Sequence, residues 1–141
     1  MTEWTVQAIK SADRSQAPCL LRLPDRRMDA QERPVCEIEV VMGQKAWTRS
    51  AADYFTALGL IRRDLEADGW LLSCYGTSRN VYPSGMARDM GLGLKAYRLH
   101  LGQHARKEDL VDIFTTGPDV DPASVDDQET FLKEWRASNK R

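Results

Sequence analysis

The chain has 141 residues, with 20 Lys or Arg against 21 Asp or Glu, which gives a formal net charge of −1. A length of this order is typical of one domain, so we expect a single domain over 1–141. The near-neutral balance argues against binding nucleic acid through its phosphates, because such proteins usually carry a basic excess. No stretch approaches the roughly 18 consecutive apolar residues of a membrane-spanning helix. We therefore expect neither a nucleic-acid partner nor a membrane partner.

The cysteine pattern and the N-terminus indicate a cytoplasmic protein. Cys19, Cys36 and Cys74 are odd in number, and their spacing matches no metal site or disulfide framework. Each cysteine stands beside apolar residues, which favours small buried side chains in a reducing compartment. The opening MTEWTVQAIKSADRS lacks the basic and then apolar segments of a signal peptide.

Residues 1–49 read as strands. Trp4, Val6 and Ala8 alternate with polar neighbours, and Ile38 and Val40 alternate with acidic ones, so each strand has one buried face. CLLRL reads as a further short strand. Gly43 indicates either a bulge or a tight hairpin turn, with 45–48 as the returning strand.

Two helices are marked by capping patterns. Ser50 and Asp53 resemble a capping box before an apolar stripe at Tyr54, Leu58, Ile61 and Leu65, and Gly69 ends this first helix. Ser124 and Asp127 repeat the pattern before the last helix. A short helix is predicted near 107–115, strands at WLLSCY and LKAYRLHL, and a frayed tail over 138–141. This order predicts an α+β fold, a mostly antiparallel sheet with helices packed on one face.

The connection between the last two predicted strands is long, polar and rich in glycine and tyrosine. Its segment 75–95 contains too many apolar residues for a disordered tail, so we expect an ordered surface. Neither a Walker A nor a dinucleotide-binding glycine pattern fits it. His100 and His104 do not form a convincing metal pair, because Gly102 stands between them. We therefore expect no cofactor and no metal.

A resemblance suggests a function. The stretch CYGTSRNVYPSGMARDMGLGLKAYRL, with LEADGWLL before it and DLVDIF, GPDV and FLKEW after it, resembles a family of small, largely uncharacterised bacterial proteins. Members of this family accompany polymorphic toxin (Rhs-type) systems and look like immunity proteins. The resemblance covers 50–137, outside the N-terminal strands over 1–49. It implies a protein that binds a cognate toxin domain and blocks its active site, and it carries over no catalytic residue.

Two hypotheses about the segment 75–95 follow. In the first, the protein is not an enzyme, and the segment contacts the toxin through its polar and aromatic side chains. The candidate binding residues are Tyr75, Ser78, Arg79, Asn80, Tyr82, Arg88, Asp89 and Lys95. In the alternative, the protein is a small-molecule or nucleotide-binding domain or an enzyme that uses the same glycine-rich segment. Its actors would be Cys74, Arg79, Ser84 or His100. The sequence leaves the oligomeric state open.

Overall fold

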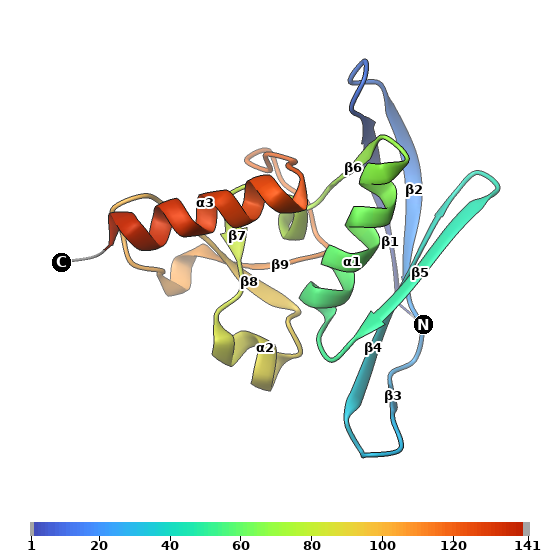
Figure 1. Cartoon of the computed structure of the whole chain (residues 1–141), viewed down its shortest axis with the longest axis horizontal. Helices are drawn as coiled ribbons and strands as arrows, with labels where there is room; N and C mark the ends of the chain where they lie inside the picture. Colours follow the sequence, from blue (N-terminus) through green and yellow to red (C-terminus); the bar gives the residue numbers. More distant parts are fainter. Residues whose placement is uncertain (1, 140–141) are drawn as a thin grey trace.

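The computed structural model describes residues 2–139, and its fold is α+β with two antiparallel sheets (Figure 1). In the larger sheet the strand order is β3-β4-β2-β1-β6, and β5 pairs with β4 on the side opposite β2. The strands of this sheet are β1 (Thr2–Lys10), β2 (Gln16–Leu23), β3 (Arg27–Met28), β4 (Pro34–Met42), β5 (Lys45–Ala51) and β6 (Trp70–Ser73).

The alternation of side chains in the strands produces the buried face of this sheet. Val6 and Ala8 of β1 are buried. The alternating residues of the next two strands are buried as well: Cys19, Leu21 and Leu23 of β2, and Cys36, Ile38 and Val40 of β4. On the outer face, Arg22 lies 3.3 Å from Glu39 across the β2–β4 pair. Gly43 has a φ of 62°, which suits the tight turn that joins β4 to β5. The predicted strand pattern and hairpin are confirmed.

Helix α1 (Tyr54–Ala67) covers the buried face of the larger sheet and carries Leu58, Ile61 and Leu65 into the core. The predicted cap at Ser50 is wrong, because Ser50 pairs with Glu37 in the β4–β5 hairpin. Asp53 caps the helix instead, and its carboxylate accepts a hydrogen bond from the Thr56 N–H at 2.8 Å.

The smaller sheet, β7-β8-β9, lies beside α1 under helix α3 (Figure 1). Its strands are β7 (Val81–Tyr82), β8 (Lys95–Arg98) and β9 (Leu110–Asp112), and α3 spans Val125–Ser138. Ser124 caps α3 as predicted, since its Oγ accepts from the Asp127 N–H at 3.1 Å. The helix predicted near 107–115 is wrong: a 3₁₀ turn, η2 (Lys107–Asp109), leads into β9, which pairs with β8. Of the predicted frayed tail, residues 140 and 141 lie outside the described residues.

One buried polar cluster joins these parts. Arg62 of α1 is buried, and its guanidinium donates to Gln128 Oε1 of α3 at 2.7 Å and to the Ala123 carbonyl at 2.8 Å. The Gln128 amide in turn donates to the carbonyls of Gly76, Ser78 and Val81 at 3.0, 2.9 and 2.8 Å. The pair therefore binds α1 and α3 to the backbone that leads into the smaller sheet.

Within residues 2–139, no helix combines the length and the apolar character needed to cross a bilayer.

We predict that Arg62→Ala destabilises the protein by about 3 kcal/mol, because the substitution leaves buried acceptors without donors. The neighbouring Arg63→Ala is the matched control, since Arg63 is exposed and pairs with the exposed Asp126 at 3.0 Å. Its effect should stay within about 0.5 kcal/mol. Urea unfolding followed by circular dichroism measures both variants. Equal losses in the two would contradict the structural role of Arg62.

Candidate functional site

The segment 75–95, predicted to be an ordered surface, is folded in the structure. It contains a 3₁₀ turn, η1 (Tyr75–Thr77), strand β7 and a short helix, α2 (Gly85–Gly91). It runs from the end of β6 to the start of β8 and so links the two sheets (Figure 1). Seven of the eight candidate residues fall into two groups along it, and Lys95 stands apart on β8.

The first group faces the loop before α3. The Tyr75 hydroxyl donates to Asp119 Oδ1 at 2.6 Å, and Arg79 Nε donates to Asp121 Oδ2 at 3.2 Å. The Tyr75–Asp119 hydrogen bond raises the pKa of the tyrosine and lowers the pKa of the carboxyl group. These two candidate side chains therefore hold the loop in place.

Ser78 and Asn80 extend the same network. Ser78 is buried, and its Oγ accepts from the Asp121 N–H at 3.0 Å and donates to Asn80 Oδ1 at 3.1 Å. The Asn80 amide donates to the Leu99 carbonyl at 3.2 Å. The hydrogen bonds of these side chains thus act within the chain.

The second group lies near α2. The Arg88 guanidinium stacks over the rings of Tyr82 and Phe55, 5.1 and 5.3 Å from their centroids. Burial raises the pKa of Tyr82, whose hydroxyl donates to Glu129 Oε1 at 3.1 Å. Asp89 is exposed on α2.

Lys95 lies at the first position of β8. Its Nζ is 3.2 Å from Asp112 Oδ1 on the neighbouring strand β9. Both side chains are more than half exposed, so this ion pair contributes little to stability.

Helix α2 is an exposed element with anchored ends. None of its residues is buried, and Met86 and Met90 are 71% and 81% exposed. Ser84 Oγ accepts from the Ala87 N–H at 3.0 Å at the start of the helix. Leu92 ends the helix with a φ of 56°, a left-handed conformation that is uncommon for a residue with a side chain. The helix thus presents two methionines to solvent in a defined orientation.

Gly76 and Gly93 of the segment serve close packing, whereas a Cβ on Gly85 or Gly91 would meet nothing within 4 Å. The N–H groups of Tyr75 and Gly76 donate to the carbonyls of Thr115 and Ile113, each at 2.8 Å. A Cβ on Gly93, which has a φ of 69°, would lie 2.7 Å from Asp53 Oδ1. These engaged amides and close contacts leave little room for a phosphate against the backbone.

The residues named for catalysis are occupied or shielded. Cys74 is fully buried, and burial raises the pKa of its thiol to about 11, so it is a poor nucleophile. Ser84 caps α2, and His100 Nε2 lies 3.4 Å from Asp109 Oδ1. No group of three or more His, Cys, Asp or Glu side chains suited to a metal ion occurs among residues 2–139.

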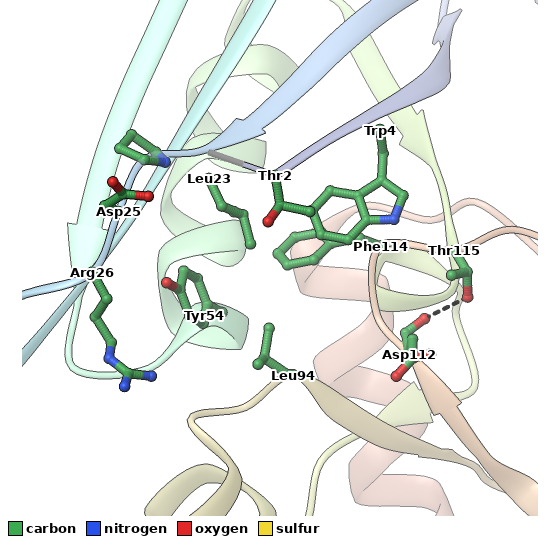
Figure 2. A pocket seen from close by; sticks show the side chains of 11 residues that line it. Thr2, Trp4, Leu23, Asp25, Arg26, Tyr54, Leu94, Asp112, Phe114 and Thr115 are labelled. Carbon is green, nitrogen blue, oxygen red and sulfur yellow. Dashed lines mark hydrogen bonds between the residues drawn. The ribbon is translucent and has the colours of Figure 1, made fainter.

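A pocket that the sequence analysis missed lies where the two sheets meet (Figure 2). Its volume is about 460 Å³, within the range of small-molecule sites. Trp4 and Phe114 stack in it with ring centroids 4.9 Å apart, and the buried Tyr54 meets Phe114 edge-on. The remaining lining residues are Thr2, Leu23, Pro24, Asp25, Arg26, Leu94, Asp112 and Thr115. These residues are distant in sequence, so only the fold brings them together.

No protein-family model matches the sequence, and no curated protein is significantly similar to it. The resemblance to immunity proteins therefore stays a prediction.

We predict that alkaline pH destabilises the protein through its buried thiols. Burial raises the pKa of Cys19 and Cys74 from the ordinary 9.0 to about 11. Below pH 9.0 both thiols are neutral in the folded and in the unfolded chain, so the stability of the fold is at its full value. Between pH 9.0 and pH 11 the thiols ionise only in the unfolded chain, so the free energy of unfolding falls. From about pH 8 to about pH 10, we expect a loss of about 1 kcal/mol per thiol. Burial also lowers the pKa of Arg62 to about 10, so loss of its proton in the folded state raises the free energy of unfolding, but only from about pH 10 upward. Urea unfolding at both pH values measures the change.

The variant with Cys19→Ala and Cys74→Ala is the control for this pH effect. Its stability at neutral pH will be lower, because the smaller side chains leave space in the core. Its loss between the two pH values should nevertheless be about 2 kcal/mol smaller than that of the unmodified protein. An equal loss would show that the thiols do not cause the effect.

We predict that Gly76→Ala destabilises the protein by about 2 kcal/mol or more. The new Cβ would lie 2.6 Å from Leu58 Cδ2, 2.9 Å from Ile113 Cβ and 3.0 Å from the Ile113 carbonyl oxygen. Gly85→Ala is the matched control, because a Cβ there meets nothing within 4 Å. That substitution should leave stability unchanged or raise it by about 0.5 kcal/mol. Thermal unfolding separates the two, and a neutral Gly76→Ala would contradict the close packing of η1.

Proposed function

We propose that this protein is an immunity protein that binds a cognate bacterial toxin domain and blocks its active site. One observation above all supports the proposal: α2 is a short helix with anchored ends and no buried side chain. Such a helix gains little from its own fold, because most helical stability comes from tertiary packing. A partner that covers α2 would supply the missing contacts.

The chemistry of α2 and its surroundings favours a protein partner. Methionine is flexible and polarizable, and it is enriched together with arginine and tyrosine at protein interfaces. Met86 and Met90 lie one helical turn apart and are exposed, and the guanidinium of Arg88, between them in the sequence, stacks on the rings of Tyr82 and Phe55. Asp89 adds an exposed carboxylate to the same helix.

The first group of candidate residues supports the proposal in a different way. Tyr75, Ser78, Arg79 and Asn80 hold the segment to its neighbours and so present α2 rigidly. A preorganised surface loses less conformational entropy on binding. We infer that these residues position the interface, whereas Arg88, Asp89 and the two methionines contact the partner.

The proposal includes a cytoplasmic location, a protein partner and no cofactor. Three cysteines that are buried and unpaired support a reducing compartment. The alternative, a small molecule or nucleotide held by the glycine-rich segment, has less support. The amides of Tyr75, Gly76 and Gly93 already donate to backbone carbonyls.

The test begins with affinity capture of the tagged protein from its own host, with the bound proteins identified by mass spectrometry. We expect one stoichiometric partner that stops growth when it is expressed alone and is neutralised by this protein. A partner without toxicity, or recovery of this protein alone, would contradict the proposed function.

The captured toxin domain then allows the interface to be tested. We predict that replacing Met86 and Met90 by Ser weakens binding at least about tenfold, because exposed apolar contacts at a hot spot are lost. The matched control replaces Met28 and Leu101, which are 59% and 53% exposed elsewhere on the protein, by Ser. Isothermal titration calorimetry measures both affinities. If the α2 variant binds as tightly as the control, α2 is not the interface.

A further inference from the structure

The pocket between the two sheets carries an inference independent of toxin binding. We propose that it binds a small aromatic carboxylate, with the ring of the ligand against Trp4 and Phe114 and its carboxylate on Arg26. Three features support this assignment: the aromatic lining, the guanidinium at one end of the pocket, and the engagement of the acidic lining residues within the protein.

The lining of the pocket favours an aromatic ligand body. Trp4 and Phe114 lie against each other with an interplanar angle of 37°, and Tyr54 meets Phe114 edge-on at 81°. Phe114 and Tyr54 are buried, whereas Trp4 is only half-buried, so Trp4 offers ring surface that a ligand can still cover. A flat ring would gain stacking and edge contacts here that an aliphatic chain would not.

Arg26 supplies a positive charge to the pocket. It follows β2 in the chain and lies on the side of the pocket away from Trp4 (Figure 2). Its guanidinium forms no hydrogen bond or ion pair with any of residues 2–139. Burial raises the pKa of Tyr54, and the charge of Arg26 acts against this rise, so the field of the guanidinium reaches the Tyr54 wall. A guanidinium can hold a carboxylate through two parallel hydrogen bonds.

The acidic residues of the lining leave this charge to a ligand. Asp112 lies across the pocket from Arg26 (Figure 2), and its Oδ1 is 3.2 Å from Lys95 Nζ on the neighbouring strand. Asp25 also has an interaction within the protein. Among the residues that line the pocket, all of them within 2–139, Arg26 is therefore the charged group that stays available. One guanidinium matches the single charge of a carboxylate better than the nearly double charge of a phosphate ester.

The experiment titrates phenylacetate, hydrocinnamate and indoleacetate into the ¹⁵N-labelled protein at millimolar concentrations, and it repeats each titration with the corresponding uncharged amide. The readout is the indole N–H signal of each tryptophan in heteronuclear NMR spectra. We expect the Trp4 signal to shift in a saturable manner with at least one acid, and the amide of that acid to bind about fivefold more weakly. The signal of Trp135 should stay in place, because its Nε1 donates to the Gln103 carbonyl outside the pocket.

Two matched variants test the role of Arg26. Arg26→Gln removes the charge at the pocket, and it should weaken binding of the acid about fivefold while leaving binding of the amide unchanged. Arg27→Gln removes the same charge from the next residue, which does not line the pocket and pairs with Glu37 at 2.7 Å. This control should bind the acid as the unmodified protein does. Equal affinities of the two variants for the acid would overturn the role of Arg26.

The remaining outcomes also decide the proposal. No saturable shift of the Trp4 signal with any of the acids would overturn it. If acetate or inorganic phosphate binds as tightly as the aromatic acids, the ring contributes nothing and the aromatic class is wrong. Tighter binding of octanoate would show that the pocket holds an aliphatic chain, which contradicts the role of the aromatic wall. Because no toxin takes part, failure here leaves the proposed immunity function untouched.

Discussion

The buried guanidinium of Arg62 is the interaction on which the arrangement of the smaller sheet depends. Burial is costly for a cation, and it lowers the pKa of Arg62 to about 10. Carbonyl groups and the Gln128 side chain offset this cost by hydrogen bonding, and the nearby Glu66 carboxylate favours the charged form. Because Gln128 also binds three backbone carbonyls of 76–81, α1 and α3 can pack together only when that segment follows its observed path.

This arrangement explains why polar residues of one segment serve different purposes. Ser78 and Asn80 lie close to the Arg62–Gln128 pair, and their side chains complete hydrogen bonds inside the protein. Met86 and Met90 lie beyond the pair on α2, and no element of the described chain covers them. The rigid first half is thus what gives the exposed second half a defined position. Composition alone suggests a single binding surface over 75–95. In the structure, side chains of 75–80 hold the segment to its neighbours, and α2 forms its exposed part.

Sequence reasoning succeeds here where a feature depends on residues that are close together in the chain, and it fails where the feature depends on distant residues. Strand alternation, the turn at Gly43 and the cap at Ser124 depend on neighbouring residues, and each is predicted correctly. Ser50 is misjudged because pairing with Glu37 across a hairpin outweighs a local capping pattern. Nothing in the sequence indicates that Arg62 is buried, since it stands beside the exposed Arg63 in a helix and resembles a solvated residue. The pocket is equally hidden, because its aromatic residues, Trp4, Tyr54 and Phe114, come from three distant parts of the chain.

The pocket between the two sheets and α2 are physically connected through a few backbone contacts. The Tyr54 N–H donates to the Leu92 carbonyl at 2.7 Å, and Leu92 is the left-handed residue that ends α2. Leu94, two residues further on, forms part of the pocket wall. Tyr54 and Leu94 of the pocket wall therefore lie next to the residue that ends the exposed helix. Because a close-packed interior leaves little free space, the wall of the pocket and the end of α2 are held by the same few contacts.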